Sequence, residues 1–204
     1  FFKHTPTHLI YNGIDTDVFS KQTEVNWIKK KYGIPEHCAI VLGLASNWYR
    51  KGLPDFLQLA SLLPPSIRIV LVGLSKSEQQ LAAQAGIIAI NRTDNIQELC
   101  ALYSAANVYF NPTWEDTFPT TNLEAMACGT PVVTYKTGGS TEAITLETGA
   151  IIEKGDIQTA AIEIGRLCQQ PATTFEDVCR QHIVRYFNKE ERFLEYLNLY
   201  AQYL

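Results

Sequence analysis

Residues 114–134, from Trp114 to Thr134, read WEDTFPTTNLEAMACGTPVVT, and this stretch contains a loop, a helix start and a strand. Pro119 and the polar run 120–122 after it predict the start of a helix, and Gly129 predicts its end. The apolar, β-branched residues that follow predict a strand. A helix that leads into a strand in this way is typical of an α/β fold.

The same alternation extends over most of the chain. Short apolar runs predict strands at 39–45, 68–73, 86–90, 108–110, 131–135 and 149–152. Helical patterns lie between them, at about 53–63, 76–85, 95–105, 121–128 and 140–145. The strands are almost continuously apolar, as in a parallel sheet covered on both faces. We therefore predict one α/β domain over residues 1–204, a Rossmann-like, doubly wound parallel sheet with helices on both faces and ligands at the carboxyl ends of its strands.

The flanking segments follow other patterns. Residues 9–14 predict a short strand that ends in an Asn-Gly turn, and 21–33 predict a peripheral helix. Two helices are expected at 156–169 and 173–186, and a terminal helix from about 189. The terminal helix has an apolar stripe, formed by Phe193, Leu197, Tyr200 and Leu204. This periodicity favours packing on its own domain, and the alternative is that part of it faces another domain.

Composition excludes several classes of protein. The net charge is −4 and no Lys/Arg run stands out, so a nucleic-acid partner is not expected. We find no signal peptide and no apolar stretch long enough to cross a bilayer, and five scattered cysteines predict reduced thiols, so we expect a cytoplasmic protein. The chain opens on Phe1 and its single methionine is Met126, which predicts that it is part of a longer protein.

Two carboxylates, Asp116 and Glu124, flank the predicted helix start with seven residues between them. A helix N-terminus offers free N–H groups and a partial positive charge, which suit a phosphate. Two acids beside it would hold the hydroxyls of a sugar and a ribose, so the arrangement predicts a nucleotide-sugar site. Local interpretations stay open. Thr121 to Glu124 also fits a capping box, and Asp116 fits a turn residue, with Glu115 as a competitor for its role.

Arg50 and Lys51 follow the first long strand, after the segment that begins at Ser46. A cation at this end of a parallel strand can reach a phosphate and stabilise a departing diphosphate without a metal ion. The alternative is a pair of solvated loop charges. Gly138 and Gly139 predict a flexible turn that opens the helix containing Glu142.

Other motifs are missing from the sequence. There is no GxGxxG fingerprint, no GxSxG elbow and no P-loop, so nicotinamide dehydrogenases, hydrolases of that type and P-loop NTPases find no support. The four histidines are dispersed, and we predict no metal site and no cofactor.

Several motifs together resemble the C-terminal, donor-binding domain of family 4 retaining glycosyltransferases of the two-Rossmann-domain (GT-B) type. Residues 11–19, YNGIDTDVF, are similar to the family's "NGID…F" segment, and Lys51-Gly52 matches its "KG". Leu99, Leu102, Tyr103 and Ala106 resemble its "L-x-x-LY-x-x-A" helix. Residues 123–133, LEAMACGTPVV, match its core signature, and 138–142, GGSTE, resemble its "GG-x-P-E".

The resemblance implies roles for individual residues. Glu124 would hold the donor ribose, Asp116 would contact the transferred sugar, and Lys51 would bind the diphosphate of a UDP- or GDP-sugar. Residues 118–123 would supply backbone donors to the diphosphate, and the nucleobase would lie against the loop 91–93. The substrate-binding set that we predict is Ser46, Arg50, Asn91, Arg92, Thr93, Thr117, Phe118, Pro119, Thr120, Thr121, Asn122 and Leu123.

The chain departs from the family pattern at two places. Asp116 is one methylene shorter than the usual glutamate, and many members have an arginine about five positions before the lysine, where this chain has Leu44-Ala45-Ser46. Arg50 is the candidate to replace that arginine.

The resemblance implies sugar transfer with retained configuration, in polysaccharide or glycan synthesis. An N-terminal domain would bring the acceptor, a glycan or a lipid-linked sugar, and any membrane association. Residues 1–20 would connect the two domains, and 187–204 would face the other one. On this view the fragment alone is inactive. Two alternatives stay open, a GT-B-type nucleotide-sugar epimerase or phosphorylase-like relative and a non-catalytic module.

Overall fold

The computed structural model describes residues 6–45 and 49–203, and its centre is a six-stranded sheet in which every pairing is parallel. The strand order is β3-β2-β1-β4-β5-β6. The strands are β1 (Ala39–Leu44), β2 (Ile67–Val72), β3 (Ile88–Ile90), β4 (Val108–Asn111), β5 (Val132–Tyr135) and β6 (Gly149–Ile152). All six were expected from the apolar runs, and the doubly wound parallel sheet is confirmed.

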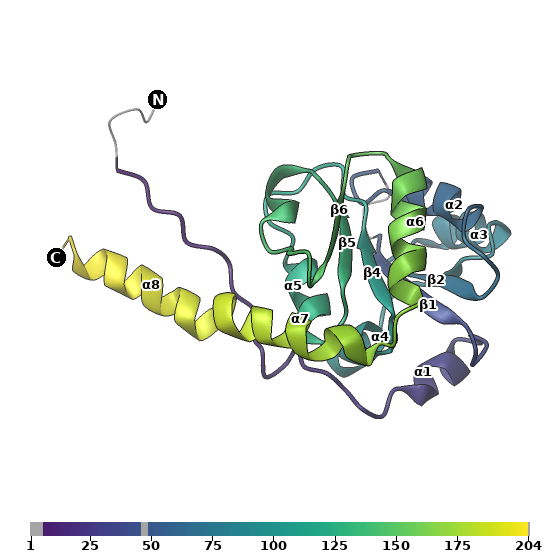
Figure 1. Cartoon of the computed structure of the whole chain (residues 1–204), viewed down its shortest axis with the longest axis horizontal. Helices are drawn as coiled ribbons and strands as arrows, with labels where there is room; N and C mark the ends of the chain where they lie inside the picture. Colours follow the sequence, from purple (N-terminus) through teal and green to yellow (C-terminus); the bar gives the residue numbers. More distant parts are fainter. Residues whose placement is uncertain (1–5, 46–48, 204) are drawn as a thin grey trace.

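Helices cover both faces of this sheet (Figure 1). One face packs against α2 (Leu53–Ala60), α3 (Lys76–Gln84) and α6 (Ile157–Cys168). The other packs against α4 (Ile96–Ala105), α5 (Thr120–Ala127) and α7 (Thr173–Tyr186), with α1 (Asn26–Lys31) beside α4.

The two faces form two separate apolar cores. In β1, Ile40 and Leu42 belong to the core under α4 and α5, whereas Val41 belongs to the core under α2 and α6. Successive side chains of a strand point to opposite faces, so a strand buried on both sides has to be apolar at every position. This requirement explains the unbroken apolar runs in the sequence.

The winding direction of the sheet reverses between β1 and β4. From β1 the chain moves outward to β2 and β3, and from β4 it moves the other way to β5 and β6. The two central strands pair directly, with Val41 opposite Val108. The loops that leave their carboxyl ends therefore diverge, and they leave a crevice where ligands bind in folds of this kind. Lys51 follows β1 and Asp116 follows β4, so both lie at this crevice.

The flanking segments depart from the sequence prediction in three places. Residues 9–14 form no strand, and only Ile14 makes an isolated bridge, to Asn188. The expected helix 140–145 is instead a short 3₁₀ turn, η1 (Gly138–Thr141), whose first residue, Gly138, takes a left-handed conformation. The peripheral helix expected at 21–33 is limited to the six residues of α1.

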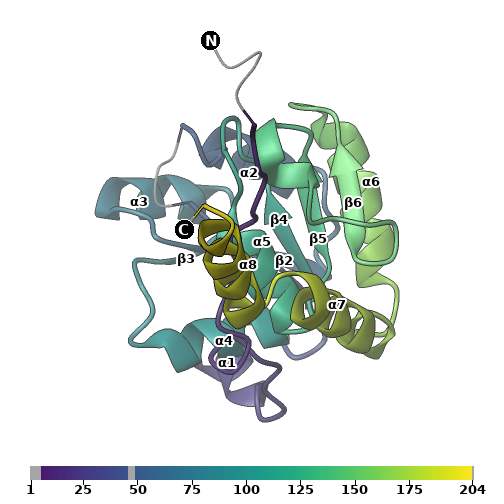
Figure 2. The same ribbon diagram turned by 90° about the vertical axis from the view of Figure 1, so that its left-hand side faces the viewer.

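The last helix, α8 (Lys189–Ala201), extends away from the body beside the N-terminal segment (Figures 1 and 2). Residues 8–10 and 195–202 line one groove, so the two segments lie side by side. None of the α8 residues is buried, and Phe193, Leu197 and Tyr200 are 59%, 61% and 61% exposed. Leu204 lies outside the described residues, and for the other three residues of the stripe the expectation of packing on their own domain is wrong.

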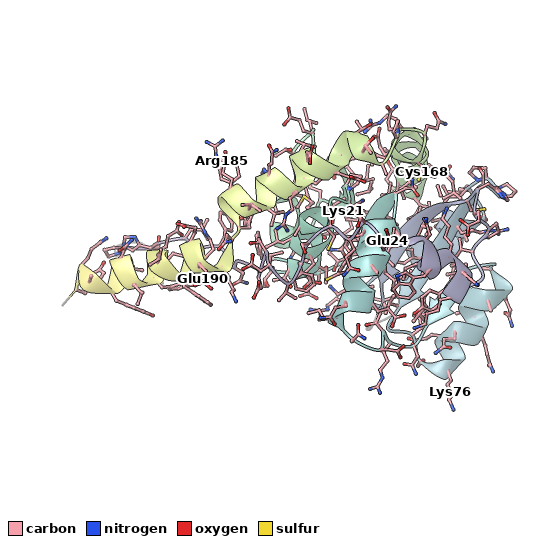
Figure 3. The ribbon with its side chains drawn as sticks, turned by 90° about the horizontal axis from the view of Figure 1, so that it is seen from below. Lys21, Glu24, Lys76, Cys168, Arg185 and Glu190 are labelled. Atoms are coloured by element: carbon pink, nitrogen blue, oxygen red, sulfur yellow. The ribbon has the colours of Figure 1, made fainter. Side chains whose placement is uncertain are left out.

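The chain is tied together at the base of this extension. Ile14 N–H donates to Phe187 O at 2.9 Å, and Lys189 N–H donates to Ile14 O at 3.0 Å. Further along, Lys21, which is labelled in Figure 3, forms an ion pair with Glu176 of α7 and donates to Ser104 O of α4. The N-terminal segment is thus held against helices from the middle and the end of the chain.

Candidate functional site

Lys51 and Asp116 meet at the crevice between β1 and β4. Lys51 Nζ donates to Asp116 Oδ2 at 3.0 Å, and each side chain is only 12% exposed. The charge of Lys51 also acts on Glu124 and opposes the rise of its pKa. The alternative, that Arg50 and Lys51 are a pair of solvated loop charges, is wrong for Lys51. The Lys51 side chain is largely shielded from water and is paired with Asp116.

Backbone contacts hold the two loops together. Trp114 N–H donates to Arg50 O at 2.9 Å, next to Lys51. Gly52 has a φ of +69°, and a Cβ there would lie 2.4 Å from Pro112 O, so only glycine allows this close approach. Lys51 is therefore positioned by the backbone on both of its sides.

The Asp55 side chain links the same loops by hydrogen bonds. It is buried in the first turn of α2, with 7% exposure. Its Oδ2 accepts a hydrogen bond from Trp114 Nε1 at 2.7 Å, and its Oδ1 accepts one from the Tyr135 hydroxyl at 2.9 Å. The carboxylate thus connects the loop that carries Asp116 to the helix that follows Lys51. Sequence reasoning missed Asp55, since nothing local indicates that its partners lie 59 and 80 residues away.

Glu124 is not part of a capping box. Helix α5 begins at Thr120 with Pro119 as its N-cap, and no side chain caps it. Glu124 therefore lies in the second turn, where its Oε2 accepts a hydrogen bond from the Tyr103 hydroxyl at 3.0 Å. Burial raises the pKa of Glu124, and hydrogen bonds from Tyr103 and Thr120 together with the charge of Lys51 oppose this shift.

The start of α5 faces the crevice, and only a few of its backbone N–H groups can bind an anion there. The first amides of a helix have no partner within it, which makes those of Thr120 and Thr121 the candidates for binding an anion. Pro119 has no N–H to donate. The Asn122 N–H donates to Pro119 O at 3.1 Å, and Leu123 is fully buried. Binding of the diphosphate by backbone donors within 118–123 stays a prediction, with Thr120 and Thr121 as its main candidates.

Side chains around the start of α5 are structural. Asn122 is 1% exposed and links two elements, since its Oδ1 accepts from Asn111 Nδ2 at 2.8 Å and its Nδ2 donates to Ser140 O at 3.1 Å. The Phe118 ring stacks on Tyr11, with 5.2 Å between the centroids. These contacts hold the helix start against β4, η1 and the N-terminal segment.

The glycine pair supports the loop that carries Asp116. Gly138 has a φ of +46°, and a Cβ on it would lie 1.9 Å from Asp116 O. Gly139 N–H donates to Thr117 O at 3.0 Å. The two glycines therefore pack against the backbone of residues 116 and 117, rather than forming the flexible turn that the sequence suggested.

The other predicted residues lie at the periphery or outside the described part of the chain. Asn91, Arg92 and Thr93 follow β3, the outermost strand, at the same edge of the sheet as Lys51 and Asp116. The Arg50 side chain is exposed. Ser46 lies outside the described residues.

A cavity lies away from this crevice. It measures about 650 Å³ and lies between α7, the start of α8 and the loop after η1. Its charged side chains are of both signs: Glu142, Glu147, Arg185 and Arg192.

Within residues 6–45 and 49–203, no cluster of three or more His, Cys, Asp or Glu side chains is arranged to hold a metal ion. None of the helices in these same ranges has the length and apolar composition needed to cross a membrane.

The sheet order and the reversal of winding at its centre define a Rossmann-like, doubly wound domain. The chain belongs to the family described as glycosyl transferases group 1, whose model matches residues 38–170, more than half of its length. The resemblance seen in the sequence motifs is therefore confirmed.

Individual relatives agree with this assignment. The chain is 30% identical over 166 residues to D-inositol 3-phosphate glycosyltransferase of Stackebrandtia nassauensis, covering 72% of this chain and 37% of that protein. It superposes on sucrose-phosphate synthase from Thermosynechococcus elongatus with a TM-score of 0.83 and 27% identity, over 96% of this chain and 52% of the other. HepE of Anabaena, solved in complex with UDP and glucose, shares the fold with a TM-score of 0.82 and 19% identity, over 96% of this chain and 56% of HepE. The chain thus spans about half, or less, of the length of these relatives.

Proposed function

We propose that this chain is the donor-binding domain of a retaining glycosyltransferase, which transfers a sugar from a nucleoside-diphosphate sugar to an acceptor hydroxyl in polysaccharide or glycan synthesis. The observation that carries the proposal is the cluster at the crevice. The shielded pair of Lys51 and Asp116 lies where the sheet changes direction, and α5, which carries Glu124, begins in the loop that follows Asp116. Family membership and the UDP named in the HepE structure support a nucleotide-sugar as the ligand.

Each part of the cluster has a chemical task in this proposal. Lys51 and the first amides of α5 bind the diphosphate and stabilise the negative charge that develops on it as the sugar leaves. Glu124 accepts hydrogen bonds from the ribose hydroxyls, and Asp116 accepts one from the transferred sugar. The loop 91–93 lies against the nucleobase. Arg50 is the proposed second cation for the phosphates.

The reaction exchanges one bond for another at the anomeric carbon. The bond from this carbon to the phosphate oxygen breaks as the bond to the acceptor oxygen forms on the same face. The acceptor proton passes to the departing phosphate, so no metal ion and no protein base is required. The task of this chain is then positioning and charge stabilisation. The acceptor is a glycan or a lipid-linked sugar, and an N-terminal domain binds it.

A panel of UDP-, GDP- and ADP-sugars tests the proposal by thermal shift and by amide NMR. We expect one nucleotide series to raise the melting temperature and to perturb the amide signals of residues 117–123. The Glu124→Ala variant should weaken both effects. Unchanged signals at about millimolar donor, a concentration that would detect even weak binding, would exclude the proposal. Donor binding together with unchanged transfer in a Lys51→Ala variant of the complete enzyme would favour a non-catalytic module.

A further inference from the structure

Tyr103 contacts the candidate ribose-binding residue from inside the protein. It lies on α4, is fully buried, and its hydroxyl donates to Glu124 Oε2 at 3.0 Å. We propose that Tyr103 is a positioning residue for nucleotide binding, because its hydroxyl holds Oε2 of Glu124 and so fixes the orientation of the carboxylate toward the ribose hydroxyls. The inference rests on the proposed function, since it assigns a task to a residue behind the same site.

The Tyr103 ring has little freedom to move. It packs edge-on against Tyr109 of β4, with 5.5 Å between the ring centroids and 73° between the planes. The backbone of Tyr103 is fixed as well, because Thr130 Oγ1 donates to its carbonyl oxygen. A hydroxyl on such a ring presents its hydrogen at a defined place. The orientation of Glu124 is therefore set by a rigid part of the core and not by the loop around Asp116.

The hydroxyl also stays a donor under ordinary conditions. Burial, followed by the charge of Glu124, raises the pKa of Tyr103 well above its usual value of 10.0, so the phenol keeps its proton. A neutral donor opposes the cost of keeping a carboxylate ionised inside the protein. The groups that act on Glu124 or sense its charge are Tyr103 and Cys100 of α4, Tyr109 of β4, Thr120 of α5 and Lys51 before α2.

A purely structural tyrosine would have a different signature. Removal of a buried hydroxyl lowers stability whatever its partner is, so loss of stability alone does not test the inference. Only a positioning residue would change the recognition of ribose. The measurement must therefore compare nucleotides that differ at the ribose.

The Tyr103→Phe variant is tested by calorimetric titration with UDP and with 2′-deoxy-UDP, from about pH 5 to 8, a range that includes the protonation of a partly buried carboxyl. We expect UDP to bind about 3- to 10-fold more weakly, the effect of one lost hydrogen bond, and 2′-deoxy-UDP to change much less. The pH below which UDP binding is lost should move upward, because Glu124 then protonates more easily. Tyr32→Phe is the matched control, since it also removes a hydroxyl that donates to a glutamate, here Glu98, and it should leave the preference for ribose unchanged.

The outcomes are distinguishable. If Tyr103→Phe binds both nucleotides as the wild type does, with the same pH dependence, Tyr103 has no positioning role. If the wild type binds neither UDP nor any other nucleoside diphosphate, the proposed function fails and this inference fails with it. Should Tyr103→Phe not fold, Glu124→Asp tests the same contact, because a shorter acid keeps the charge but loses the reach to Tyr103. Retention of the full preference for ribose in Glu124→Asp would then overturn the inference.

Discussion

Lys51 and Asp116 are 65 residues apart in the sequence and meet at 3.0 Å, each with 12% exposure. An ion pair so shielded is held in place by its surroundings, and removal of one partner leaves the other charge without compensation. In the free protein the two residues neutralise each other. In the proposed complex the Lys51 ammonium group binds the phosphates, and the Asp116 carboxylate accepts a hydrogen bond from the sugar.

We expect Lys51→Met to weaken UDP binding about 10- to 100-fold, the value of a hydrogen bond to a charged group. Calorimetric titration at constant ionic strength measures this change. Lys136→Met is the matched control, because Lys136 pairs with Glu153 in an exposed contact, with side chains 65% and 73% accessible. Such a pair contributes little, so the control should bind UDP normally. Equal binding by Lys51→Met and the control would remove Lys51 from the site.

Glu124 should make the protein less stable at neutral pH than a neutral residue would. Burial raises its folded pKa above the unfolded value, so the folded state binds the proton more readily between the two values. The free energy of unfolding therefore decreases as the pH rises through this window and stays lower above it. We expect Glu124→Gln to raise the melting temperature at about pH 8 but not at about pH 4, where the acid is protonated in both states. The same variant should bind UDP more weakly, and a melting temperature lowered at pH 8 would contradict this reading.

The sequence allowed the residue types of the site to be predicted but not their partners. Asp116, Glu124 and Lys51 were found because their order and spacing resemble a family motif. The capping-box alternative was wrong, because α5 begins at Thr120 and no side chain makes a capping hydrogen bond at its N-cap residue, Pro119. The contacts of Asp55 and Tyr103 depend on tertiary packing, which no local pattern encodes.

At the scale of elements, the loop that carries Asp116 depends on the start of η1. Gly138 packs against the Asp116 carbonyl in a left-handed conformation that other residues adopt only at a cost. We expect Gly138→Ala to lower the free energy of unfolding by about 1–3 kcal/mol and to abolish UDP binding, because the loop must move away. Denaturant unfolding and titration measure the two effects.

Gly165 provides the control for this substitution. It lies inside α6, and a Cβ there would meet nothing within 4 Å. Gly165→Ala should therefore be neutral or stabilising by about 0.5–1 kcal/mol, since alanine is the better helix former. If both variants behave alike, the close approach at Gly138 does not support the site.

Elements inside the sheet were easier to predict than those around it. Strands and helices that pack on both sides of the sheet have strong apolar periodicity, and each was found within a few residues. Residues 9–14 looked like a strand because they are apolar, yet a strand needs a neighbour, and only Ile14 finds one. Residues 140–145 looked helical, but the chain there follows the glycine pair into a tight turn.

The whole molecule has a body and an extension. Because no residue of α8 is buried, Phe193, Leu197 and Tyr200 add nothing to the core of this chain. We propose that the stripe faces the N-terminal domain of the complete enzyme, as the family resemblance implies, with residues 1–20 as the other connection. The packing of α8 on its own domain had been the simpler expectation from its periodicity, which reports an apolar face but not what covers it.

Substitutions on α8 should therefore leave the stability of this chain almost unchanged. We expect Phe193→Ala and Leu197→Ala, at 59% and 61% exposure, to change the free energy of unfolding by no more than about 0.5 kcal/mol. Phe187→Ala, at 5% exposure just before α8, should cost about 3–5 kcal/mol. Denaturant titration of the three variants checks the contrast. A large loss at Phe193 or Leu197 would show that α8 packs on the body in solution.

The junction between Ile14 and Asn188 has a consequence for how the protein folds and opens. Asp15 and Lys189, which pair beside it, are 174 residues apart, so this contact closes a loop that contains almost the whole chain. Loop-closure entropy for such a length is about 4–5 kcal/mol if the chain between is disordered, and far less once the sheet has formed. The junction should therefore form late and open first, and native-state hydrogen exchange should release the amides of Ile14 and Lys189 before those of β1 and β4.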